Sequence, residues 1–412
     1  MHFDYDILIA GAGPAGCAAA YDLARAGKRI LLLDRRTFPR PKACACGLTR
    51  KTLKALRYSV DPVIERVSNE IVLQRAANSK DNFADKSVEV RIRSRNPICA
   101  MAVRERFDDF CLQQTLAAGA QLRKIETIAA LRELPTHLEL DIVMATGAET
   151  LRAPVLIGAD GSNGQTRRLE HLLRDKSAHD WYTRGFALEA LIPYAALPAQ
   201  LPAGAAPHDS VFDFSPIPGG YGWLFPKGDH INIGVGAFAP KESRGDPSSA
   251  TASSSPKVGP TDARFKQVTR TLLAAYTQQK LGVALPAEVT GQHLGMGGHL
   301  YVPRGRVLLA GDAAGLVDPL TGEGIHSAIV SGQAAAAAVL AGDADLAAAY
   351  ARHLAPLQQT LAFSYRAARA FYKEPERGFR AMKLPFLRSL ILKTYADGLP
   401  HTRLLTALAK LV

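Results

Sequence analysis

The sequence predicts an α/β protein in which a nucleotide-binding domain with a parallel β-sheet is interleaved with a second domain built on a mixed β-sheet. A C-terminal helical segment follows. Three observations predict this fold. A strand, a glycine turn and a helix follow one another in residues 6–26, and similar units recur in 155–168 and 305–339. The stretch "YGWLFPKGDHINIGVG" (221–236) alternates apolar residues with glycines, as a strand does. Residues 361–412 mix basic and apolar side chains, as surface helices do.

The composition sets limits on the setting of the protein. The chain has 412 residues, of which 47% are hydrophobic, enough for two domains or one large interleaved one. No run reaches the roughly 18 apolar residues of a membrane span, and no signal peptide is visible at the start. The five cysteines are too few and too irregularly spaced for a disulfide framework or a zinc site. We therefore expect a reducing, cytoplasmic setting and no metal.

The first strand–turn–helix unit, "DILIAGAGPAG", carries a G-x-G-x-x-G fingerprint. Gly11 allows the tight turn, Gly13 lets a pyrophosphate approach the backbone, and Gly16 lets the helix pack on the sheet. The helix N-terminus supplies amide donors and the positive end of its dipole. Asp34, at the end of the next strand, is placed to accept hydrogen bonds from a ribose. The sequence thus predicts a Rossmann-type dinucleotide site with the candidate residues Gly11, Gly13, Pro14, Ala15, Gly16, Asp34 and Arg35.

Two later strands also end in an acid beside a glycine, at Asp160-Gly161 and at Gly311-Asp312. We expect the Asp312 carboxylate to accept a hydrogen bond from a ribityl or ribose hydroxyl. The amides of residues 322–324 are expected to approach the pyrimidine edge of a flavin. These three elements in this order, without a second G-x-G-x-x-G, resemble the para-hydroxybenzoate hydroxylase-like flavoproteins. In those proteins one domain assembled from separated segments holds FAD.

Two further stretches are similar to the geranylgeranyl reductase family within that group. "PKACACGLTRKTLKAL" (41–56) resembles its K-P-C-G-G-G-L-S segment, although Ala45 and Cys46 replace two glycines. The stretch 221–236 matches its Y-x-W-x-F-P-K motif, and the whole resemblance covers most of residues 1–340. In "VRERFDDF" the resemblance places Arg104 at the ribose and phosphate region of the flavin. The remaining FAD-binding residues that it implies are Cys44, Ala45, Gly47, Arg104, Ile128, Asp160, Gly161, Gly311, Asp312, Pro319, Gly322, Gly324 and Ile325.

The resemblance implies an FAD-dependent reductase of carbon–carbon double bonds in an isoprenoid substrate. The candidate substrate-binding residues are Tyr221, Trp223, Phe225 and Pro226. The three aromatic residues are expected to form flat apolar walls for a prenyl chain, and Pro226 to turn the strand at its end. Cys44 is the candidate proton donor by its position in the family motif. We interpret Lys227 as a solvated turn residue. Two electron donors stay open: NADPH and a reduced ferredoxin, the latter an electron-donor protein.

The predicted domains follow from these segments. Residues 1–56, 101–165 and 290–342 are assigned to a discontinuous FAD-binding domain. Residues 57–100 and 166–289 are assigned to the substrate domain, with a Ser/Pro/Gly-rich exposed loop at 240–262. Residues 343–412 form the C-terminal helical segment.

Charge suggests a further partner. The chain carries 50 Lys and Arg against 38 Asp and Glu, and seven of the twelve net positive charges fall in residues 361–412. We expect peripheral association of this tail with an anionic surface of the inner membrane, against the simpler reading of a solvated basic face. No nucleic-acid module accompanies the charge, so nucleic-acid binding is not expected. Two other functions stay open: an FAD-dependent monooxygenase on the same fold, and a flavoprotein that modifies a partner protein.

Overall fold

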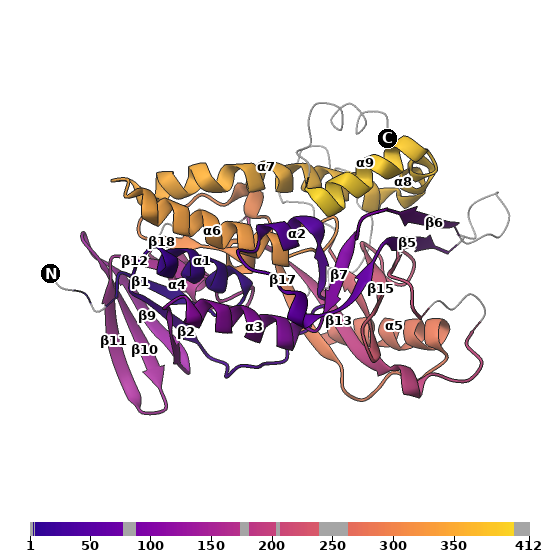
Figure 1. The fold of residues 1–412 in the computed structure, drawn as a ribbon, viewed down its shortest axis with the longest axis horizontal. Coiled ribbons are helices and arrows are strands. Elements are labelled where there is room, and N and C mark those ends of the chain that lie inside the picture. Colours follow the sequence, from indigo (N-terminus) through magenta and orange to yellow (C-terminus); the bar gives the residue numbers. More distant parts are fainter. Residues whose placement is uncertain are drawn as a thin grey trace.

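The computed structural model describes residue 3 and residues 5–76, 88–173, 181–202, 207–238 and 263–398. The loop predicted at 240–262 and the end of the tail, from residue 399, lie outside the described residues. In Figure 1 two regions of β-sheet lie next to each other, and the C-terminal helices run along one side of both. Within the described part of the chain, no helix combines the length and apolar character needed to cross a membrane.

Five of the described strands form a parallel sheet in the order β18-β12-β1-β2-β8. Ile7 of the central strand pairs with Val155 on one side and Ile30 on the other, so segments far apart in the sequence are neighbours. The α/β class and the assembly of one parallel sheet from separated segments are therefore confirmed. The strands are β1 (Ile7–Ala10), β2 (Ile30–Asp34), β8 (Gln121–Lys124), β12 (Val155–Gly158) and β18 (Val307–Leu309).

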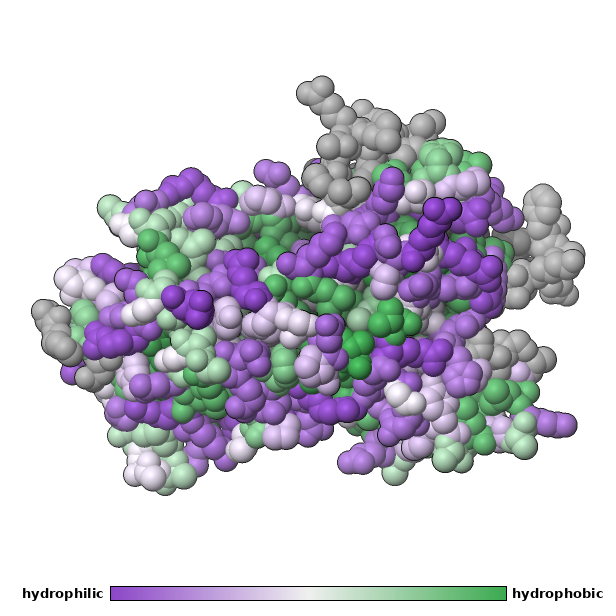
Figure 2. Space-filling view, in the orientation of Figure 1, coloured by the Kyte–Doolittle hydropathy of each residue, from purple (hydrophilic) through white to green (hydrophobic). Residues whose placement is uncertain are grey.

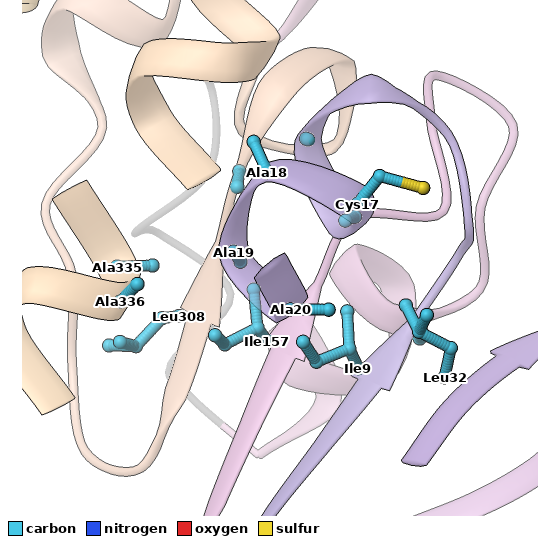
Figure 3. Packing of buried hydrophobic residues seen from close by; sticks show 14 of the residues in the cluster. Ile9, Cys17, Ala18, Ala19, Ala20, Leu32, Ile157, Leu308, Ala335 and Ala336 are labelled. Carbon is cyan, nitrogen blue, oxygen red and sulfur yellow. The ribbon is translucent and has the colours of Figure 1, made fainter. Parts of the chain in front are cut away.

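Three helices pack around this sheet: α1 (Pro14–Arg25), α3 (Arg104–Ala117) and α6 (Ile325–Ala341). Figure 3 shows alanines of both α1 and α6 within one buried cluster. The two helices approach closely at Gly332 of α6, where a Cβ would lie 2.2 Å from the carbonyl oxygen of Ala15. Below them, Ile9, Ile157 and Leu308 project from three adjacent strands into the same buried cluster. Each fully buried Ile or Leu contributes about 1.5–3 kcal/mol of transfer free energy. This core fixes the carboxyl ends of the parallel strands, where the predicted glycine turns lie.

Seven of the described strands form a mixed sheet in the order β17-β13-β16-β15-β14-β5-β6. All neighbouring pairs are antiparallel except β14 and β5. Helix α5 (Ala263–Leu281) packs on one face through Leu273 and Tyr276. The strands are β5 (Glu70–Arg75), β6 (Val88–Arg93), β13 (Thr183–Pro193), β14 (Val211–Asp213), β15 (Gly220–Pro226), β16 (His230–Ala237) and β17 (Thr290–Met296).

The stretch 221–236 is two strands rather than the one predicted. Strands β15 and β16 pair in antiparallel register, with Tyr221 opposite Gly236 and Pro226 opposite Ile231. Pro226 does end its strand, as predicted, and the chain reverses through residues 227–229. The aromatic residues of β15 thus lie beside the glycine-containing strand β16.

The remaining described strands form two small antiparallel sheets, β11-β10-β9 and β3-β7-β4. Their strands are β3 (Gly47–Thr49), β4 (Ile64–Ser68), β7 (Cys99–Ala102), β9 (Thr127–Glu133), β10 (Leu138–Met144) and β11 (Gly147–Ala153). The short helices are α2 (Arg50–Ala55), α4 (Thr166–Leu172) and the 3₁₀ turns Asp61–Val63, Tyr194–Ala196, Gly298–Leu300 and Gly311–Ala314.

The C-terminal segment is helical, and its inner face packs against the seven-stranded sheet. Phe379 and Met382 are buried in one cluster with Tyr221 and Trp223 of β15. Arg50 binds Asp397 at 2.7 Å (Nε to Oδ1), which ties the end of the described chain to α2. The helices are α7 (Leu346–Lys373), α8 (Pro375–Met382), α9 (Pro385–Leu392) and a π-helical turn (Lys393–Asp397). The domain boundaries given above stay a prediction.

Candidate active site

The turn between β1 and α1 forms a glycine cradle at the end of the parallel sheet. Gly11 adopts φ +99°, and a Cβ there would lie 2.3 Å from the carbonyl oxygen of Ala159. A Cβ on Gly16 would lie 1.9 Å from the Gly11 carbonyl oxygen, so this residue serves helix packing. The backbone amides of Ala12 and Arg36 donate to the two carboxylate oxygens of Asp34, each at 2.8 Å. The predicted ribose acceptor is therefore held beside the cradle.

A cavity of about 480 Å³ extends from this cradle to the seven-stranded sheet. Its volume falls in the range of roughly 300–1,000 Å³ that is typical of ligand sites. Of the predicted FAD-binding residues, Gly16 and Pro319 do not line it. Those that do are Gly11, Gly13, Pro14, Ala15, Asp34, Arg35, Cys44, Ala45, Gly47, Arg104, Ile128, Asp160, Gly161, Gly311, Asp312, Gly322, Gly324 and Ile325. The structure thus brings together residues from every segment that the sequence singled out.

Basic side chains concentrate at the part of the cavity near α3. The buried Arg104 donates from Nε to Asp108 Oδ1 at 2.6 Å, and Arg40 binds Asp108 Oδ2 at 3.1 Å. Lys42 also lines the cavity, and burial, assisted by the charge of Arg104, lowers the pKa of its ammonium group. Several cations around one carboxylate leave a net positive charge, which suits the diphosphate of a dinucleotide.

Two carboxylates stand at the ends of β12 and β18. Asp160 Oδ2 accepts from the amide and hydroxyl of Thr166, both at 2.9 Å, while its Oδ1 is buried with no partner among the described residues. Asp312 lines the cavity, and burial raises the pKa of its carboxyl while Lys42 and Arg104 oppose that shift. The unpartnered Asp160 Oδ1, the Asp312 carboxylate in the cavity wall and a cradle that leaves no room for a Cβ at Gly11 fit the hydroxyl groups and the diphosphate of FAD.

We expect Asp312→Ala to weaken FAD retention without unfolding the protein. A hydrogen bond to a charged group contributes about 1.5–3 kcal/mol, which corresponds to roughly a ten- to hundredfold change in affinity. Flavin absorbance after dialysis, together with a thermal unfolding curve, measures both effects. Asp312→Asn, which keeps an acceptor oxygen, serves as the comparison and should retain more FAD. Full flavin occupancy in Asp312→Ala would show that the carboxylate does not contact the cofactor.

Cys44 lies in a group of titratable side chains that sequence analysis did not anticipate. Its amide donates to Glu189 Oε1 at 2.9 Å, and the Cys46 amide donates to its sulfur at 3.4 Å. Glu189 is only 7% exposed, and burial together with the charge of Cys44 raises its carboxyl pKa to about 7. The carboxyl group is therefore partly protonated near neutral pH, next to the predicted proton donor.

The interpretation of Lys227 as a solvated turn residue is wrong. Its side chain is 2% exposed, and Nζ donates to the carbonyl oxygen of Ala45 at 2.6 Å and to that of Cys46 at 3.5 Å. Burial lowers the pKa of its ammonium group, and the neighbouring Cys46, Cys44 and Glu189 oppose that shift. Lys227 thus anchors the Cys44 loop to the end of β15.

The aromatic residues of β15 form an apolar wall of the cavity. Tyr221, Trp223 and Phe225 alternate with other residues along the strand and so share one face. Trp223 donates from its indole nitrogen to Asn232 at 2.6 Å, and the Tyr221 hydroxyl donates to the carbonyl of Thr321. Pro226 does not line the cavity, which corrects its assignment as a substrate contact. Residues of the wall that the sequence did not reveal are Phe212, Phe238 and Tyr395.

Comparison with known protein families gives one match that spans most of the chain. Residues 4–361 match the family described as FAD binding domain. A menaquinone reductase of Mycobacterium tuberculosis is 28% identical over 338 residues, covering 80% of this chain and 75% of that protein. Digeranylgeranylglycerophospholipid reductase 2 of Methanopyrus kandleri is 27% identical over 337 residues, covering 81% and 76%.

Solved structures share the fold. A geranylgeranyl bacteriochlorophyll reductase-like protein from Thermoplasma acidophilum superposes with a TM-score of 0.73 at 19% identity, covering 99% of both chains. The flavin-dependent brominase Bmp2 superposes with a TM-score of 0.71 at 17% identity, covering 95% of this chain and 93% of the other. At these identities the likeness extends to the fold, which proteins named as a reductase and as a brominase have in common.

Proposed function

This chain belongs to the FAD binding domain family and is an FAD-dependent oxidoreductase, and we propose that it reduces carbon–carbon double bonds of an isoprenoid substrate. The observation that carries the proposal is the shared cavity: Cys44 and the aromatic wall of β15 line the same space as the FAD-binding residues. Relatives named as reductases of prenylated lipids and of menaquinone support the substrate class. We propose NADPH or a reduced ferredoxin as the electron donor.

When bound and reduced, FAD supplies a hydride for one carbon of the double bond. The chain must then orient the alkene, exclude water and provide a proton for the other carbon. Tyr221, Trp223 and Phe225 offer flat apolar faces, and each buried CH₂ of a prenyl chain gains about 0.8 kcal/mol. Cys44 is the proposed proton donor: the Cys46 thiol is hydrogen-bonded to its sulfur and lowers its pKa, so Cys44 would pass on the proton that the two sulfurs share. The neighbouring Glu189 carboxyl, with a pKa raised to about 7, is a second proton source near neutral pH.

The C-terminal segment helps to exclude water from this cavity. Tyr395 lines the cavity and packs edge-on against Phe212, with ring centroids 6.2 Å apart. Two residues later, Asp397 receives the ion pair from Arg50. Tyr372 of α7 donates from its hydroxyl to the carbonyl oxygen of Leu320, at 2.8 Å. These contacts hold the helices against the loop that precedes α6.

The proposal is tested by single turnover without oxygen. The holoprotein is reduced anaerobically and mixed with geranylgeraniol or geranylgeranyl diphosphate, and flavin reoxidation is followed by absorbance. We expect reoxidation together with a product that has gained two hydrogen atoms. Reoxidation that needs oxygen and gives a hydroxylated product would replace the proposal with a monooxygenase. If neither the prenyl substrate nor oxygen reoxidises the flavin, and an added protein is covalently modified instead, the protein-modifying alternative would be favoured.

We also propose peripheral binding to an anionic membrane, through the residues of the C-terminal segment that remain exposed. Among the described residues 361–398, most apolar side chains are buried or partly buried, with Phe379 and Leu387 buried, so few of them remain to contact a membrane. Leu384 and Phe386 remain 48% and 59% exposed at the start of α9. Figure 2 shows the apolar surface in this region. Exposed basic residues of the same described segment are Arg366, Arg369, Lys373, Arg377, Arg380, Lys383 and Lys393.

We expect the protein to sediment with anionic vesicles at low salt and to dissociate as salt rises. Each basic residue near the surface contributes about 1 kcal/mol, and salt screens that attraction. A double substitution, Leu384→Ser with Phe386→Ser, should reduce binding. Leu300→Ser is the control, because Leu300 is similarly exposed (59%) and lies outside α8 and α9. Absence of binding to anionic vesicles at low salt would leave these helices with the sole role of closing the cavity.

A further inference from the structure

The cavity wall carries two cysteines, Cys44 and Cys46. Alkene reduction needs one proton donor, so it does not explain why there is a pair. Both line the cavity, and neither is in a disulfide. The amide of Cys46 donates to the Cys44 sulfur at 3.4 Å, so the first side chain is folded back over the second residue. Among the described non-glycine residues, Cys46 is the one with a positive φ, +47°, a conformation that cysteine rarely adopts. The loop therefore holds the Cys44 sulfur against the Cys46 backbone, and the two thiols are hydrogen-bonded to each other.

A buried cation lies against the same loop. The Lys227 ammonium group contacts the carbonyl oxygens of Ala45 and Cys46, which flank the two sulfurs, and it lies 3.9 Å from the sulfur of Met101. A positive charge close to a thiol favours its ionised form. The hydrogen bond from the Cys46 thiol, aided by the charge of Arg104 and opposed by burial, lowers the pKa of Cys44 well below its usual value. The two sulfurs thus share one proton, which favours the arrangement of a thiolate at Cys44 beside a thiol at Cys46.

The other three cysteines do not share this setting. Burial raises the pKa of Cys99 and that of Cys111 to about 12, and it raises the pKa of Cys17 well above its usual value. Thiols of this kind stay protonated and are poor nucleophiles. None of the three lines the cavity. Thiolate chemistry in the described chain is therefore concentrated at Cys44 and Cys46.

We propose that Cys44 and Cys46 are a redox-active pair that exchanges two electrons with FAD in the same cavity by forming and breaking a disulfide. In the direction of oxidation, an S–S bond forms between the Cys44 thiolate and the Cys46 sulfur, and the S–H bond of Cys46 breaks. Two electrons and that proton pass to oxidised FAD, which becomes the anionic reduced flavin. Atoms and charge balance without an external oxidant, and the reverse reaction restores thiolate and thiol. This redox reaction rests on FAD binding in the cavity, and it does not require that the substrate is an isoprenoid.

The first test counts electrons. The holoprotein is treated with diamide, freed of the reagent and titrated anaerobically with dithionite while flavin absorbance is recorded. We expect about four electrons per FAD, because a disulfide and a flavin each take two. Cys46→Gly should take two, since one thiol cannot form this disulfide and glycine accepts the positive φ. Cys99→Ala, which removes a buried cysteine outside the cavity, should still take four. An uptake of two electrons by the diamide-treated parent protein would overturn the proposal.

The second test needs no variant. Trypsin cleaves after Lys42 and Arg50 and releases residues 43–50, a peptide that contains both cysteines and no other. In the diamide-treated holoprotein, this peptide should be lighter than its dithiol form by two hydrogen atoms and should resist alkylation. After dithionite reduction it should take up two alkyl groups. A peptide that is doubly alkylated before reduction would contradict the redox pair even if FAD reduction is normal.

Discussion

Gly11→Ala is expected to lose FAD almost completely. The added Cβ would lie 2.3 Å from the Ala159 carbonyl oxygen and 2.8 Å from the Asp160 Cα, and both belong to backbone rather than to a side chain that can rotate away. The φ of +99° adds conformational strain of about 1–3 kcal/mol, before the collision is counted. Relief of the collision must move either the cradle or the end of β12, which carries Asp160. We expect FAD affinity to fall by at least roughly a hundredfold, measured from flavin absorbance and reconstitution with added FAD.

Gly119→Ala is the matched control for this prediction. Gly119 has a similar φ of +108°, but nothing lies within 4 Å of the position where its Cβ would be. It follows α3 at the surface, away from the cavity lining. Gly119→Ala therefore introduces the same kind of backbone strain without the collision. We expect it to lower the free energy of unfolding by about 1–3 kcal/mol and to leave FAD bound. If Gly11→Ala binds FAD as tightly as Gly119→Ala, the cradle does not hold the dinucleotide.

The cradle could be predicted from the sequence because its geometry is local. Strand, turn, helix and second strand occupy residues 7–34, and the spacing of Gly11, Gly13 and Gly16 within them is dictated by one turn. The later acid–glycine strand ends were equally visible, since each terminates an apolar strand at the same edge of the sheet. A dinucleotide site follows from this local pattern. That the dinucleotide is FAD came from the resemblance of the later segments, and the family match over residues 4–361 supports it.

The group around Cys44 could not be predicted in the same way, because its members are far apart in the sequence. Glu189 meets the Cys44 amide across 145 positions, and Lys227 meets the Ala45 carbonyl across 182. A single signal was present for Glu189: it is an acid within the otherwise apolar run "FALEALI" of a strand. For Lys227 the neighbouring Gly-Asp pair indicates a turn, and the local pattern then favours solvent exposure. Tertiary packing of β15 against the Cys44 loop overrides that preference.

The aromatic stretch shows a similar limit. The alternation of apolar residues continues through residues 230–236 after the turn. Periodicity alone therefore predicted one strand where the structure has two, β15 and β16. The pairing of β15 with β16 makes the aromatic wall part of a central region of the sheet, where its residues are buried on the cavity side. Tyr395, from the opposite end of the chain, completes that wall.

Cys44→Ser is expected to slow the reduction of an isoprenoid double bond by roughly 10²- to 10⁴-fold, the usual contribution of a positioned proton donor. A serine hydroxyl is a much weaker acid than the thiol, although it preserves the size of the side chain and the amide bond to Glu189. The measurement is the rate at which the anaerobically reduced holoprotein is reoxidised by geranylgeranyl diphosphate in a single turnover. FAD content should stay high, because Gly11, Asp34, Arg104 and Asp312 are unchanged.

Cys99→Ser provides the control for that experiment. Cys99 lies in β7, is buried and does not line the cavity, so its substitution tests the general cost of replacing a buried thiol by a hydroxyl. We expect its single-turnover rate to stay close to that of the parent protein. The dependence of the rate on pH should also separate the two variants, since the acid that donates the proton is removed only in Cys44→Ser. Equal single-turnover rates in Cys44→Ser, Cys99→Ser and the parent protein would remove Cys44 from the proton transfer and leave the Cys46 thiol and the partly protonated Glu189 carboxyl as the neighbouring proton sources.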